Sequence, residues 1–125
     1  MAEGPGVVRS TQRRAATGLP AGVAGEQAFH HGQGWVGFLH LEPGANSPWH
    51  HHGEWDSYAY VLAGVLRWEH GPGGRDATEV GPGDVGHMPA WTIHRDVSAG
   101  VENLEMILFR AGKGVLTIDV EGPDA

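Results

Sequence analysis

Short runs of strand-forming residues alternate with glycine and proline turn signals along most of this chain. Valine, isoleucine, leucine and aromatic residues dominate the runs, and these side chains fit a pleated, half-buried surface. No window repeats apolar residues at helical spacing between helix caps. Many short strands of this kind predict an all-β sandwich or barrel. The runs cover residues 35–41, 58–62, 65–69, 78–80, 85–88, 93–97, 104–109 and 115–120.

The length of 125 residues predicts one domain. The 21 glycines and 8 prolines are spread as turn punctuation and form no low-complexity run, which favours a globular fold. We expect an irregular N-terminal arm or short edge strands over residues 1–25, a barrel over 26–120 and a flexible tail over 121–125.

Charge and cysteine content exclude several classes of function. Eight basic and fifteen acidic residues give a net charge of −7, which argues against nucleic acid or an anionic membrane as a partner. Cysteine is absent, so disulfides, thiolate ligands and a cysteine nucleophile are excluded. No apolar stretch has the length of a signal peptide or a membrane span, and we expect a cytoplasmic protein.

Three consecutive histidines, His50, His51 and His52, carry the first chemical signal. Alternate side chains of an extended chain share a face, so His50 and His52 point together and His51 points away. Two imidazoles on one face are half of a metal site. A further histidine, His94, follows a second segment punctuated by glycine and proline and is the candidate third ligand.

The spacing of these residues resembles the two motifs of cupins, which are small double-sheet β-barrels. The resemblance covers roughly residues 35–110 and implies an all-β cupin fold, a double-stranded β-helix or jelly-roll barrel. It also implies that His50, His52 and His94 hold one metal ion. The matching positions are Gly44, five residues, His50-x-His52, then Gly64, and, eighteen residues later, Gly83, five residues, Pro89, His94 and Ser98.

Three positions depart from the cupin pattern. Trp91 stands where the second motif has a glycine, and Ser98 replaces its asparagine. The glutamate ligand of the first motif is missing. Counting forward from His52 places Asp56 at that position, whereas counting back from Gly64 places Ser57 there.

A shift of one residue exchanges the two faces of a strand, so both registers remain open. If Asp56 faces the barrel, Tyr58 and Tyr60 face it as well. If Ser57 faces the barrel, Ala59 and Val61 line the interior instead. A β-bulge would reconcile the two counts.

A second, local resemblance bears on the missing ligand. The spacing from His52 to Gly64 is similar to that of pirins, a cupin branch that takes its fourth ligand two residues beyond the second-motif histidine. The corresponding residue here is Asp96. Residues i and i+2 of a strand share a face, which agrees with that role. Asp96 and Asp56 are therefore rival candidates for the fourth ligand.

Three neutral imidazoles and one carboxylate suit a divalent transition metal ion: Fe, Mn, Ni, Cu, Co or Zn. Protein ligands of this kind leave coordination positions for water, substrate or dioxygen. The alternative interpretation is that the histidine run is a solvated loop with no metal role.

Further residues are candidates for the reaction or the pocket. Glu54, Tyr58 and Tyr60 could move a proton near the metal. Trp49, Trp91, Phe38 and His40 could line a substrate pocket, although aromatic residues more often belong to a core or an interface.

We expect a small metal-dependent enzyme that acts on a small organic molecule by dioxygenase-type oxidation. The alternatives are a non-redox, metal-assisted isomerase, cyclase or lyase, and a non-catalytic ligand-binding cupin. The resemblance also implies a homodimer that pairs through outer sheets, with the N-terminal arm crossing to the partner.

Overall fold

Eleven β-strands and one 3₁₀ turn make up the regular structure of residues 4–125, which the computed structural model describes. The prediction of an all-β barrel is confirmed. The strands are β1 (Arg14–Ala15), β2 (Val23–His31), β3 (Gly34–Leu41), β4 (His50–His51), β5 (Asp56–Ala63), β6 (Leu66–His70), β7 (Asp76–Val80), β8 (Val85–Met88), β9 (Arg95–Ser98), β10 (Leu104–Ala111) and β11 (Ile118–Asp119), and the turn is η1 (Pro72–Gly74).

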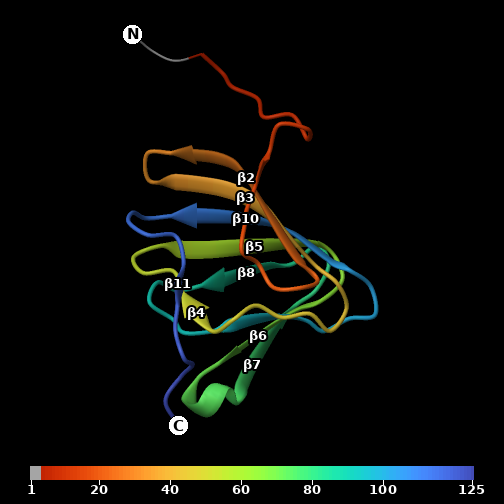
Figure 1. Cartoon of the computed structure of the whole chain (residues 1–125), viewed down its shortest axis with the longest axis vertical. Helices are drawn as coiled ribbons and strands as arrows, with labels where there is room; N and C mark the ends of the chain where they lie inside the picture. The colour runs from red at the N-terminus through yellow and green to blue at the C-terminus, as the bar shows by residue number, and fades with distance from the viewer. Residues whose placement is uncertain (1–3) are drawn as a thin grey trace.

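The strands form two layers (Figure 1). One layer is a six-stranded antiparallel sheet in the order β1-β2-β3-β10-β5-β8. The other contains β7-β6-β9 and the pair β11-β4. Two isolated bridges, Asn46 to Val97 and His50 to His94, join these two parts of the second layer. The second bridge brings the two cupin-like motifs side by side.

Alternation along β5 decides the register left open by the sequence. Ser57, Ala59 and Val61 are buried, whereas Tyr58 and Tyr60 are exposed. The register counted back from Gly64 is therefore the one adopted, and the two tyrosines lie on the outer face. The inner face of β5 contributes to a continuous apolar core made of Trp35, Leu41, Trp55, Ala59, Val61, Leu66, Trp68, Val80, Met88, Leu104, Met106 and Leu108.

The ends of the chain differ most from the predicted elements. Strand β2 pairs with almost the whole length of β3 but was not predicted, because Gly25, Glu26 and Gln27 interrupt any apolar alternation. At the other end, the strand expected over 115–120 is reduced to β11, which pairs with β4. Residues 1–3 of the expected arm lie outside the described residues.

Within residues 4–125 no helix has the length and apolar character needed to cross a lipid bilayer.

Candidate metal centre

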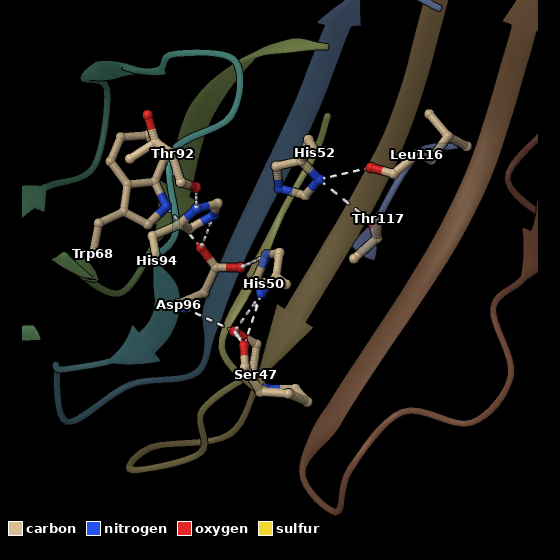
Figure 2. Close-up of polar contacts among 10 residues, drawn as sticks. Ser47, His50, His52, Trp68, Thr92, His94, Asp96, Leu116 and Thr117 are labelled. Carbon is tan, nitrogen blue, oxygen red and sulfur yellow. Dashed lines mark hydrogen bonds and ion pairs between the residues drawn. The ribbon is translucent and has the colours of Figure 1, made fainter. Parts of the chain in front are cut away.

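His50, His52 and His94 converge inside the barrel (Figure 2). Each residue is 5% exposed or less. One nitrogen from each ring lies within 4.8 Å of the others, a spacing at which one ion could serve all three. The β-bridge between His50 and His94 fixes the two segments relative to each other, since each backbone N–H donates to the other residue's carbonyl at 2.9 Å. The structure therefore brings together the three histidines predicted from the sequence.

Each of these rings is held at Nδ1 by a backbone carbonyl. The acceptors are Pro48 O for His50 at 2.7 Å, Leu116 O for His52 at 2.8 Å and Thr92 O for His94 at 2.9 Å. A carbonyl only accepts, so the proton of each neutral imidazole is on Nδ1. Each Nε2 then keeps its lone pair, as a metal ligand requires.

Asp96 supplies a carboxylate beside the histidines. Its Oδ2 lies 3.8 Å from Nε2 of His50, and its Oδ1 lies 3.8 Å from Nε2 of His94. The indole N–H of Trp68 donates to Oδ1 at 2.7 Å, and the Asp96 backbone N–H donates to Ser47 Oγ at 2.9 Å. These contacts hold the carboxylate on the inner face of β9, two residues beyond His94.

The electrostatics of the cluster favour unprotonated rings at His52 and His94. Burial, together with Arg110, His50 and His94, lowers the pKa of His52 to about 3. Burial is also the main cause that lowers the pKa of His94. For Asp96 burial acts to raise the pKa, but the neighbouring imidazoles and the Trp68 N–H outweigh it and keep the pKa below its ordinary value. Neutral imidazoles and an ionised carboxylate are a donor set that fits a divalent transition metal.

The cluster opens into a cavity of about 320 Å³. This volume is at the lower end of the range for small-molecule sites. His50, His52, Asp96 and Arg110 are among its polar lining residues, and leucines and Trp35 form much of its apolar wall. The segment from Arg14 to Pro20, within the expected arm, also lines the cavity.

Asp56 does not reach the cluster. Its Oδ1 accepts hydrogen bonds from Nε2 of His87 at 2.8 Å and from the backbone N–H of Ala90 at 3.3 Å. The His87 hydrogen bond is the main cause of a lowered pKa at this carboxyl. Because Ser57 takes the inward position of β5, Asp56 points outward, and the interpretation of Asp56 as a ligand is corrected.

The three candidates for proton transfer also lie elsewhere. Tyr58 and Tyr60 are 40% and 36% exposed on the outer face of the six-stranded sheet. The ring of Tyr58 stacks on His87, with the centroids 4.9 Å apart. Glu54 is exposed in the turn between β4 and β5. None of these side chains lines the cavity beside the histidines.

Of the four predicted pocket residues, only Phe38 lines this cavity. His40 makes a close hydrogen-bond contact with Glu105 and lines a separate outer groove. The guanidinium of Arg95 covers the Trp49 ring, with the Arg95 Cζ 4.7 Å from the centroid of that ring. Trp91 is 62% exposed, adopts a positive φ of 65° and contacts His51. The position is a glycine in cupins, and the left-handed backbone here explains that preference.

Sequence reasoning missed Arg110, which lines the cavity beside His52. Period-two alternation along β10 was the available signal, because Leu104, Met106 and Leu108 are buried and Arg110 is the next residue on that face. It also missed Trp68 as the partner of Asp96, because that contact joins strands far apart in the sequence.

Comparison with known proteins gives the family and the fold. A family model described as "Cupin domain" matches residues 37–110. No curated protein matches the chain by sequence. Among solved structures, the polyketide cyclase RemF from Streptomyces resistomycificus has a TM-score of 0.73 at 19% identity, covering 93% of this chain and 85% of that one.

Two further structures show the same fold. KdgF from Halomonas sp. has a TM-score of 0.69 at 19% identity, over 88% of this chain and 96% of that one. Oxalate decarboxylase from Bacillus subtilis has a TM-score of 0.70 at 20% identity, over 80% of this chain and 28% of that one. The family match spans more than half of the 125 residues. The resemblance expected from the two motifs is thus confirmed, and the chain belongs to the cupin family.

Proposed function

We propose that this cupin is a metal-dependent enzyme that acts on a small organic molecule. One observation carries the proposal: three buried imidazoles, each with its Nδ1 proton donated to a backbone carbonyl, present their Nε2 atoms to one point at a cavity. Preorganised ligands of this kind bind metal without a cost of reorientation.

His50, His52 and His94 are the proposed ligands, and Asp96 is the proposed fourth. Its two oxygens lie 3.8 Å from Nε2 of His50 and of His94, so a small movement would bring the carboxylate to the same ion. A bound transition metal would hold oxygen atoms of the substrate and, when redox-active, pass electrons to dioxygen. The chain itself orients the ligands and shields the centre within the barrel.

Dioxygenase-type oxidation is the reaction that we propose first. A centre of three histidines and one carboxylate accepts Fe, Mn, Ni or Cu, and leucines give the cavity beside it a largely apolar wall. The test is metal analysis of protein purified from its native source, paired with oxygen uptake on dihydroxy-aromatic and diketone compounds. We expect about one redox-active ion per chain and substrate-dependent oxygen uptake. Substoichiometric metal, with small-molecule binding that is insensitive to chelator, would instead identify a non-catalytic binding protein.

A non-redox reaction is the second candidate, and the placement of Asp96 favours it. A carboxylate held by Trp68 beside the ligands could accept a proton from a metal-polarised substrate, as isomerisation, cyclisation or C–C lysis requires. Zinc as the native ion, with turnover but no oxygen uptake, would establish this chemistry. Asp96→Asn separates the two roles of this carboxylate. If Asp96 is a metal ligand, the substitution weakens metal binding. If Asp96 is the base, the substitution lowers turnover and leaves the metal content unchanged.

We also propose that two copies pair through the outer face of the six-stranded sheet. This face exposes large apolar side chains, including Phe29, Tyr58, Tyr60, Leu62 and Phe109. Exposed apolar patches on small proteins commonly mark interaction surfaces. Light scattering is expected to report a dimer, and a monomer at micromolar concentration would contradict the proposal.

A further inference from the structure

Arg110 places a cation inside the barrel. It is the last inward residue of β10, and its cross-strand neighbours are Trp35 on β3 and Ser57 on β5. The side chain lines the same cavity as His50 and His52. The residue is half-buried with a fully buried Nε, and arginine is rarely buried without a partner.

One face of the guanidinium packs on an aromatic ring, but the residues that the structure describes provide no counter-ion for it. Its Cζ lies 4.6 Å from the ring centroid of Trp35, whose indole N–H is fixed by a 2.9 Å hydrogen bond to Gln27 Oε1. Its Nε is buried without a hydrogen-bond partner, and within residues 4–125 no carboxylate lies at ion-pair distance from Arg110. Burial lowers the pKa of Arg110 only to about 10, so the group is charged at neutral pH. Stacking on a ring leaves the N–H edge of the fork for an acceptor.

Asp96 does not fill this role. Its Oδ1 accepts the Trp68 N–H and faces His94, and its Oδ2 faces His50. Three other charged residues line the cavity, Arg14, Glu26 and Asp119, and all have greater access to solvent than Asp96. Glu26 is already paired with Arg13 at 3.3 Å. Among residues 4–125, therefore, no carboxylate pairs directly with the guanidinium at the buried end of the cavity, although the charge of Asp96 acts to raise the pKa of Arg110.

We propose that Arg110 binds the carboxylate of the substrate, so that this cupin takes small carboxylic acids that carry a second oxygen donor, such as a hydroxyl or carbonyl group. The inference rests on the proposed function, because the second oxygen is the atom that reaches the metal. A guanidinium and a carboxylate match in two parallel hydrogen bonds. A divalent ion, Arg110 and Asp96 together carry a net charge of +2, which a substrate with a carboxylate and an ionised hydroxyl would neutralise.

The remaining wall of the cavity defines the body of the substrate. Leu19, Leu39, Leu108 and Leu116 line it, and its volume is about 320 Å³. These side chains favour a compact apolar body, such as a single ring or a short branched chain, between the two oxygen-bearing ends.

The experiment compares 2-hydroxybenzoate with 2-hydroxybenzamide, which have the same ring and hydroxyl but differ in charge. Binding is measured by calorimetry, and by the indole N–H resonance of Trp35, for chelator-treated and Zn²⁺-loaded protein. We expect wild-type protein to prefer the acid by about tenfold or more, since a hydrogen-bonded ion pair is lost with the amide. Arg110→Met should reduce the preference to less than about threefold with metal content unchanged. The matched control is Arg67→Gln, which removes a guanidinium that pairs with Glu69 and Glu79 outside the cavity, and it should keep the preference.

Arg110→Lys provides a second variant in case Arg110→Met does not fold, because it keeps the charge and loses the planar fork; it should weaken acid binding and leave amide binding unchanged. Equal affinity for acid and amide in wild-type protein, or a preference that survives in both Arg110 variants, would overturn the inference. The chelator-treated samples show whether the carboxylate-binding proposal or the metal-site proposal has failed. A preference that depends on Arg110 without Zn²⁺ binding supports the carboxylate site and contradicts the metal-dependent function, whereas Zn²⁺ binding without a charge preference does the reverse.

Discussion

Trp68 and Asp96 face each other across β6 and β9, and the indole N–H of Trp68 donates to Oδ1 of Asp96 at 2.7 Å. This hydrogen bond orients the carboxylate toward the histidines, as outer contacts orient the ligands of metal sites generally. Trp68→Phe should therefore weaken Zn²⁺ binding by about tenfold, measured by competition with a chelating dye. Trp49→Phe is the control, because Trp49 lies beneath Arg95 outside the cavity. Equal effects of the two substitutions would show that Trp68 does not orient the carboxylate.

Adjacent histidines should differ sharply in their importance for metal. His52→Ala removes a buried ring of the cluster and should reduce metal affinity by more than about 100-fold while the barrel stays folded. His51 accepts a hydrogen bond from the Gly53 backbone N–H at 3.0 Å and contacts Trp91. His51→Ala should keep its metal. Elemental analysis and circular dichroism of both variants check the prediction, and normal metal content in His52→Ala would count against the site.

The left-handed backbone at Trp91 should be costly for a residue other than glycine. Trp91 has φ 65° and is 62% exposed, so its ring contributes little burial in return. Trp91→Gly should be more stable than Trp91→Ala by about 1 kcal/mol, because both remove the ring and only glycine adopts this conformation freely. Urea denaturation measures the difference. Equal stability of the two variants would mean that the loop relaxes to another conformation.

The backbone of Gly37 lies against the Trp35 ring on which the Arg110 guanidinium stacks. A Cβ at this position would lie 2.1 Å from Cη2 of Trp35 and 2.5 Å from the carbonyl oxygen of Glu26. Gly37→Ala should destabilise the fold by about 2 kcal/mol and displace the Trp35 ring. Gly34→Ala is the control, because its Cβ would meet nothing closer than 3.5 Å and the change should stay within about 0.5 kcal/mol. Thermal melts followed by near-UV circular dichroism distinguish the two.

Metal-free protein should lose stability in mild acid. The unfolded chain protonates its imidazoles below about pH 6.5. Folded His52 stays neutral until about pH 3, and burial also lowers the pKa of His94. Between these values the unfolded state binds more protons, so the free energy of unfolding falls as the pH falls. The loss from His52 should be on the order of 2 kcal/mol between pH 7 and pH 5.

Urea denaturation of chelator-treated protein at several pH values tests this dependence. His52→Gln provides the comparison, because a glutamine side chain does not titrate. The variant should show a flatter pH profile than the wild-type protein. Parallel profiles would show that His52 does not contribute to the acid sensitivity.

Local pattern predicted the strands and the histidine cluster, because motif spacing and side-chain alternation are properties of the sequence itself. The run over 85–88 coincides with β8, and His50 and His52 share a face as expected. Asp56 shows where the local argument fails. Two counts differed by one residue, and only the pairing of β5 with β8 and β10 decides which face turns inward.

Arg110 shows a different limit of sequence reasoning. Alternation along β10 would have predicted its inward position had the predicted strand continued past residue 109, but no sequence pattern would have predicted its lack of a partner. That property depends on every side chain around the cavity, including Trp35 and Asp96 from other strands. The same holds for Trp68, whose contact with Asp96 joins residues 28 positions apart.

The anchors of the three imidazoles differ in where they come from. His50 and His94 are anchored by carbonyls two residues earlier in the chain, whereas His52 relies on Leu116, 64 residues later. During synthesis on the ribosome, two rings can be oriented as soon as their own segments fold, but the third waits until Leu116 has emerged. A nascent protein that meets its metal before Leu116 emerges would therefore offer two oriented imidazoles in place of three.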